Sequence, residues 1–173
     1  TTGLGIDYYD PKSNRFNVIN FIPDKTSRLR SFSIRSVLED NNDDVWIGAE
    51  VLYKWERKTG KITSFEKSSN EPTAFGNTII FSMIQCSEGN IWAATTEGLL
   101  LYNPKTAEQR LYKYVEGKND GLPQSEVYTV FQDLDNDIWI ATEKYLSKLI
   151  DKEKGIFQSF SYHSASTFYE QVR

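Results

Sequence analysis

The stretch DVWIGAE at residues 44–50, which contains Trp46, occurs three times in this chain with small changes. Its other copies are NIWAATTEG, around Trp92, and DIWIATEK, around Trp139. These tryptophans are 46 and 47 residues apart. A fixed spacing in this range is typical of repeat architectures, in which each unit is one supersecondary element packed against its neighbours.

Apolar runs lie before the three tryptophans: SIRSVLED, IIFSMIQC and VYTVFQD. They are short and rich in β-branched and aromatic residues, which predicts strands. Their apolar residues are neighbours rather than alternating, so we expect these strands to be buried on both faces. Val37, Met83 and Val130 hold the equivalent place in the runs, nine residues before each tryptophan.

A polar turn follows each run. Three residues before the tryptophan, the turn carries Asp43, Gly89 or Asn136. These residue types tolerate a left-handed backbone, which a tight hairpin turn requires. The tryptophan then opens a second strand, and each unit continues through a third and a fourth strand, which are LLLYNP and RLYKY in the middle unit.

Each unit therefore contains four short antiparallel strands. One sheet of this length cannot bury both faces alone, whereas sheets stacked around an axis can. The sequence predicts an all-β fold, a β-propeller fragment of four-stranded antiparallel blades. The residues expected to be structural parts of the repeat are Trp46, Trp92, Trp139, Gly89, Gly98 and Tyr102.

We predict a single partial propeller over residues 1–173, with about three full blades and partial blades at both ends. The blade units are expected at approximately 1–22 (partial), 34–66, 78–115, 126–162 and 167–173, the last being the start of another blade. Propellers generally close with 4–8 blades. The expected partners are therefore the remainder of the propeller or a second copy of the chain.

The composition disfavours some classes of partner. The formal net charge is −4, so the chain has no basic field to hold a nucleic acid. No apolar run approaches the roughly 18 residues needed to cross a bilayer, and we expect no membrane contact by this segment. Cys86 is the single cysteine and lies in an apolar run, where it is expected to be a small buried hydrophobe without an internal disulfide.

The phrases EGNIWAATTEGLLLYNPKT and DGLPQSEVYTVFQDLDNDIWIAT resemble the two-component regulator propeller repeat. The resemblance covers essentially the whole chain, and its clearest pieces are Gly121-Leu122-Pro123, Trp92 and residues 98–104. The departures are small. The unit of Trp46 lacks one turn residue, and the unit of Trp139 has Lys144-Tyr145 where Gly-Leu is expected.

This resemblance implies a piece of the periplasmic sensor region of a hybrid two-component system, of the kind abundant in gut Bacteroidetes such as Bacteroides. In that family two propellers precede an immunoglobulin-like domain, a membrane helix and a cytoplasmic histidine kinase. The family typically senses oligosaccharides and switches on genes for their uptake and breakdown. An oligosaccharide ligand and signalling to a kinase elsewhere in the protein are thus expectations from the resemblance.

The residues themselves indicate a non-enzymatic segment without a cofactor. His163 is the only histidine and no nucleophile motif accompanies it, so we interpret it as a loop residue rather than as part of a triad. A single histidine and a single cysteine do not make a zinc ligand set. Two alternatives stay open: a protein–protein interaction scaffold, and a propeller glycosidase or lyase using a pair among the 24 acidic residues.

The acidic turn DLDND at residues 133–137 resembles the opening of a calcium loop. Such a loop also needs a glycine at its sixth position and a glutamate at its twelfth, which here are Ile138 and Lys144. We therefore interpret the turn as a hairpin and predict no metal site.

Ligands of propellers usually bind at one mouth of the ring, on loops that the scaffold positions. The longer loops between units are residues 70–77 and 117–126. A sugar site needs polar side chains for the hydroxyls and an aromatic face for the ring. The candidate ligand-binding residues are Arg35, Asn77, Asn119, Asp120, Gln124 and Tyr128. The alternative is that these residues only solvate and end the loops.

Overall fold

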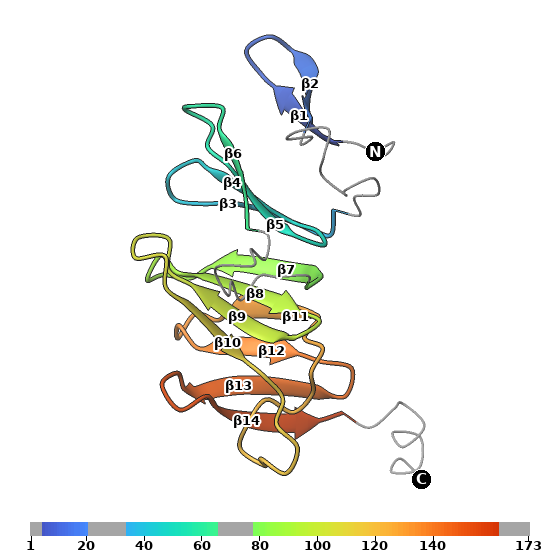
Figure 1. The fold of residues 1–173 in the computed structure, drawn as a ribbon, viewed down its shortest axis with the longest axis vertical. Helices are drawn as coiled ribbons and strands as arrows, with labels where there is room; N and C mark the ends of the chain where they lie inside the picture. The colour runs from blue at the N-terminus through green and yellow to red at the C-terminus, as the bar shows by residue number, and fades with distance from the viewer. Residues whose placement is uncertain (1–4, 21–33, 66–77, 163–173) are drawn as a thin grey trace.

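The computed structural model describes residues 5–20, 34–65 and 78–162, and the regular structure in those ranges is entirely β-strand (Figure 1). β1 (Gly5–Asp10) and β2 (Arg15–Asn20) pair as a two-stranded antiparallel sheet. Three four-stranded sheets follow, here called blades A, B and C.

Blade A consists of β3 (Ser36–Glu39), β4 (Val45–Gly48), β5 (Leu52–Trp55) and β6 (Ile62–Ser64). Blade B consists of β7 (Ile80–Gln85), β8 (Ile91–Thr95), β9 (Gly98–Tyr102) and β10 (Gln109–Tyr112). Blade C consists of β11 (Thr129–Gln132), β12 (Ile138–Ala141), β13 (Tyr145–Asp151) and β14 (Ile156–Ser161).

Strands within each blade lie in chain order and pair antiparallel with their neighbours. β7 contacts both β3 and β11, so the first strand of each blade is the one nearest its neighbours' first strands (Figure 1). Antiparallel four-stranded sheets meeting through their first strands are the blades of a propeller, which confirms the predicted fold class. The predicted start of a further blade at 167–173 lies outside the described residues.

The repeated tryptophans lie on the blade face that meets the next blade. Trp46 is 1% exposed and packs in one cluster with Ile80 and Tyr102 of blade B. Trp92 is 2% exposed and packs in a second cluster that includes residues of blade C. Trp139, in the last described blade, is only half-buried. The core therefore lies between blades, and each blade depends on its neighbour for burial.

Asp40 organises the first turn of blade A and also holds Trp46. Its Oδ1 accepts hydrogen bonds from the amides of Asn42 (2.8 Å) and Asp44 (3.1 Å), and its Oδ2 accepts one from Trp46 Nε1 (2.8 Å). Asp133 makes the same three bonds in blade C, to residues 135, 137 and 139. The carboxylates of these acidic turns therefore bind the turn itself.

The left-handed turn residues are where the sequence places them. The backbone φ is +66° at Asp43, +84° at Gly89 and +67° at Asn136. In the outer turns of blades A and C, this geometry lets the aspartate side chain reach two amides at once. The interpretation of DLDND as a hairpin turn is confirmed by the Asn136 amide, which donates to the Asp133 carbonyl (3.1 Å).

In blades B and C, a glutamine joins the blade to the one before it. Gln85 of blade B accepts a hydrogen bond from the Asn41 amide of blade A (2.8 Å) through Oε1 and donates to its own turn at the Gly89 carbonyl (3.0 Å). Gln132 of blade C repeats this with the Ser87 amide of blade B (2.8 Å) and its own turn. These bonds fix the relative height of neighbouring blades.

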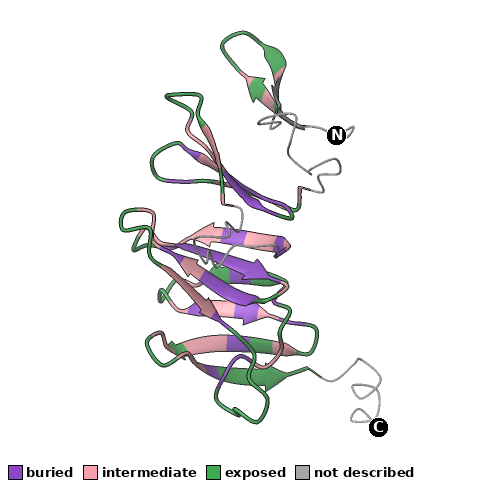
Figure 2. Ribbon diagram, viewed as in Figure 1, coloured by how far each residue is buried: buried purple, intermediate pink, exposed green. Residues whose placement is uncertain are grey.

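The expectation that the first strands are buried on both faces is wrong for β3 and β11. It holds only in part for β7, where Ile80 and Met83 are buried and the other four residues are half-buried. β3 and β11 are not buried on both faces: Val37 is 52% exposed, and Thr129 and Phe131 are exposed as well. In blades A and C, one face has no complete described blade against it. The described strand that is buried along its full length is β8, in the middle blade (Figure 2).

Candidate functional site

The innermost strands begin with three side chains that hold the same place in the repeat. Arg35, Phe81 and Tyr128 each lie eleven residues before a repeat tryptophan. Cζ of Arg35 lies 5.5 Å from the centroid of the Phe81 ring, whose centroid lies 5.2 Å from that of Tyr128. We call these three residues the axial row, because their strands are the innermost ones.

Backbone pairing places the row. The Arg35 amide donates to the Gly48 carbonyl (2.9 Å), and the Tyr128 amide donates to the Ala141 carbonyl (2.9 Å). Both residues thus continue the pairing of an innermost strand with its neighbour, just before the strand proper begins. Phe81 lies within β7, at an irregularity of its pairing with β8. The row is therefore carried on the rigid sheets rather than on loops.

The row combines a cation with two aromatic rings. Arg35 is exposed, Phe81 is half-buried and Tyr128 is 42% exposed. The Tyr128 hydroxyl donates to Glu126 Oε2 (2.8 Å), and this hydrogen bond raises the pKa of Tyr128 above its ordinary value. Within the described part of the chain, Arg35 forms no ion pair. Its guanidinium can still bind an acidic group.

The other predicted ligand residues do not join the axial row. Gln124 Oε1 accepts hydrogen bonds from Thr142 Oγ1 (2.7 Å) and from the Lys144 amide (2.9 Å), so this oxygen supports a turn of blade C. The Asp120 carbonyl accepts from the amide of Phe157 in β14, at the opposite edge of the sheet from β11. Asn119 is exposed in the same loop, and Asn77 lies outside the described residues.

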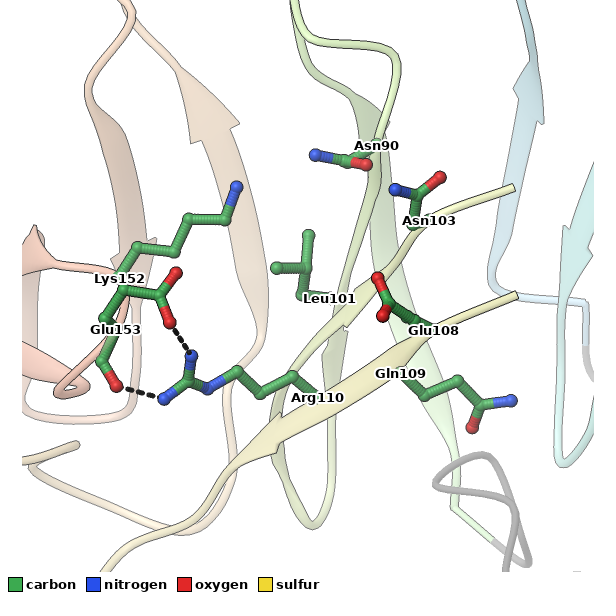
Figure 3. Close-up of a pocket in the computed structure, with 8 residues that line it drawn as sticks. All are labelled: Asn90, Leu101, Asn103, Glu108, Gln109, Arg110, Lys152 and Glu153. Atoms are coloured by element: carbon green, nitrogen blue, oxygen red, sulfur yellow. Dashed lines mark hydrogen bonds and ion pairs between the residues drawn. The ribbon is translucent and has the colours of Figure 1, made fainter. Parts of the chain in front are cut away.

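Apart from the axial row, a hollow of about 510 Å³ lies between blade B and the outer turn of blade C (Figure 3). Its origin is a change in the repeat. Blades A and C have an Asp–Lys ion pair beside the tryptophan, and the residues in those places in blade B are Asn90 and Leu101. Lys152 of blade C supplies the cation over Trp92 instead, 6.0 Å from its ring.

The polar groups around this hollow already have partners. Arg110 binds the Glu153 carboxylate (3.0 Å) and carbonyl, as Figure 3 shows. Lys152 Nζ lies 3.0 Å from Glu88 Oε2. Asn103 Oδ1 accepts from two amides of its own turn. Because a ligand would have to break these bonds, the hollow is a weaker candidate than the axial row.

No group of three or more metal-ligating side chains lies together within residues 5–20, 34–65 and 78–162. His163, interpreted as a loop residue, falls outside those ranges. No helix that could span a membrane occurs in the described part of the chain.

Comparison with solved structures supports the resemblance to sensor propellers. The chain is similar to the extracellular domain of the hybrid two-component system BT4673 of Bacteroides thetaiotaomicron, with 25% identity over 95% of the chain and a TM-score of 0.67. It is also similar to the extracellular domain of BT3049 from the same organism, with 18% identity over 91% of the chain and a TM-score of 0.64. These solved structures confirm the resemblance to the sensor region of hybrid two-component systems that the sequence indicates.

The chain spans about a fifth of those extracellular domains, 20% and 23% of their lengths. A virginiamycin B lyase from Staphylococcus aureus shares the fold, with 16% identity over 75% of the chain, 41% of the lyase covered and a TM-score of 0.55. At that identity the likeness extends to the fold alone. No family model and no curated protein matches the sequence.

Proposed function

We propose that this chain is part of the extracytoplasmic, periplasmic sensor region of a hybrid two-component system. In this proposal the propeller binds an oligosaccharide, and binding is passed to a histidine kinase elsewhere in the protein. Similarity to two extracellular domains of such systems supports the sensor role. A ligand can drive signalling only through a difference in affinity for the active and inactive receptor.

The axial row is the observation that carries the ligand part of the proposal. Aromatic faces and planar charged groups are what bind sugar rings and their substituents. Tyr128 offers an exposed ring beside the carboxylate of Glu126, which can accept a hydrogen bond from a sugar hydroxyl. The three residues rest on the sheets, so the site needs little reorganisation on binding.

A matched pair of tyrosines tests this proposal. Tyr128 is 42% exposed and Tyr114 is 44% exposed, but Tyr114 lies in the loop between β10 and β11 and outside the row. A panel of oligosaccharides is screened by the shift in melting temperature of the protein. We expect Tyr128→Ala to abolish the shift given by the active sugar and Tyr114→Ala to keep it. Equal effects of the two substitutions would refute the assignment.

We also propose that a further blade covers the open face of blade C. Phe131 and Phe160 are exposed on this face and stack on Trp139, with centroids 6.3 and 6.2 Å away. Leu134, fully exposed, holds the place of Asn41 and Ser87, whose amides bind the glutamine of the next blade. The face thus continues the pattern of the two described interfaces.

Hydrogen exchange at the Leu134 amide tests what covers this face. Slow exchange in a monomeric form of the protein that extends beyond Arg173 would support a further blade. Protection that rises with protein concentration, together with a doubled mass in sedimentation, would instead identify a second copy of the chain as the partner.

A further inference from the structure

We infer that the axial row selects an acidic oligosaccharide, one whose sugar ring carries a carboxylate or sulfate group. This inference rests on the proposed sugar-binding function and names the class of sugar. The argument starts from Arg35. Its equivalents in blades B and C are Phe81 and Tyr128, so the site has one cation among three places that the repeat makes equivalent.

The position of the guanidinium favours an anion on the ligand. Arg35 lies over the Phe81 ring, 5.5 Å from its centroid, and has no carboxylate partner among the described residues. This cation–π contact restricts where the guanidinium lies, and its N–H groups form no ion pair with a described carboxylate; a carboxylate or sulfate accepts two such hydrogen bonds at once. Arg57 differs, because its guanidinium, over Trp55, is paired with Glu39 (3.1 Å).

The row also has a direction. The cation lies at the blade A end, and the Tyr128–Glu126 pair lies at the blade C end. An acidic group on Arg35 therefore leaves the neutral, hydroxyl-bearing part of the sugar to reach Tyr128. A carboxylate placed at the Glu126 end would meet a like charge and be disfavoured. The two ends together orient an acidic sugar in one sense along the row.

Titration calorimetry of the protein tests this inference with matched sugars. The probes are oligogalacturonate, the same oligomer as its methyl ester, and a chondroitin sulfate oligosaccharide of similar length. We expect at least one acidic probe to bind, and the methyl ester to bind about 10- to 100-fold more weakly than the galacturonate if the carboxylate is the recognised group. Tight binding of the sulfated probe instead would identify sulfate as the anion.

The variants separate the inference from the function beneath it. Arg35→Gln should weaken binding of the acidic probe by a similar 10- to 100-fold and remove the preference of the protein for the galacturonate over its ester. Arg57→Gln should change neither the affinity nor this preference. Sugar binding that needs Tyr128 but is unchanged in Arg35→Gln would overturn the acidic selectivity and leave the oligosaccharide function standing. Failure of acidic and neutral sugars alike to bind the unmodified protein would overturn both.

Discussion

Replacing Asp40 with alanine should be among the most destabilising single changes to the outer turn of blade A. The side chain is 4% exposed, and its carboxylate accepts three hydrogen bonds. The hydrogen bonds from two of these donors, the Asp44 amide and Trp46 Nε1, are buried from solvent. An unsatisfied buried donor costs about 1–3 kcal/mol, so the loss of two should lower the unfolding free energy by about 2–6 kcal/mol.

Asp133→Ala is the matched comparison, since Asp133 makes the same three bonds in blade C. There Trp139 is only half-buried, so water can replace the lost acceptor and the destabilisation should be smaller. Asp40→Asn, which keeps one acceptor oxygen, should fall between Asp40→Ala and the unmodified chain. Urea unfolding followed by tryptophan fluorescence measures all three. A loss below about 0.5 kcal/mol for Asp40→Ala, or a larger loss for Asp133→Ala than for Asp40→Ala, would mean that Asp40 does not hold the turn and Trp46 as described.

Trp92→Ala should lower the unfolding free energy by about 3–5 kcal/mol, because the ring is buried between blades; a change within about 0.5 kcal/mol would mean that the repeat register is wrong. The hydrogen bond from the Trp139 indole holds the pKa of Asp133 below its ordinary value, so the ionised carboxylate stabilises the fold above about pH 4 and this stabilisation is lost as pH falls through the lower folded-state pKa. Asp133→Asn should therefore flatten the acid side of the curve of unfolding free energy against pH, and an unchanged slope would contradict this. Gly98→Ala should lower the unfolding free energy in urea by more than about 2 kcal/mol, because φ is +133° and the added Cβ would lie 2.1 Å from the Tyr112 carbonyl oxygen. Gly117→Ala, where φ is +79° and the added Cβ would meet open space, should lower it less. A larger loss for Gly117→Ala would contradict the packing described around Gly98.

The blades were predictable because their chemistry recurs. The tryptophan strand, the left-handed turn residue and the apolar first strand each appear three times, so a strand or turn predicted in one unit is supported by the equivalent residues of the other two. The different groups around Trp92 were not predictable. Cys86 stands where Asp40 and Asp133 stand, and the cation over the ring comes from Lys152 of the neighbouring blade, which spacing within one unit does not indicate.

The candidate site was predicted in part. Arg35 and Tyr128 are predicted from equivalent repeat positions, and the structure places both next to the Phe81 ring. Phe81 is not predicted as a site residue, because within IIFSMIQC it cannot be distinguished from the other apolar residues of a strand. Its place eleven residues before Trp92, equivalent to that of Arg35 and Tyr128, is the signal that identifies it.

The prediction of Asn119 and Asp120 as ligand residues rests on their polarity and their place in a long loop. That loop runs instead to the outer edge of blade C, because Leu122 is buried in the core between blades B and C and the Asp120 carbonyl binds β14. Polarity within a loop does not tell which end of a blade the loop reaches. An equivalent position on a strand does, since the sheet fixes it.

The proposed role as a propeller segment of an extracytoplasmic sensor can be tested by sequencing the gene on both sides of this segment. We expect further units with a tryptophan about every 46–47 residues, followed by a membrane helix and a histidine kinase. A gene in which the repeats run into a catalytic domain, or end soon after Arg173 without a membrane helix, would contradict it.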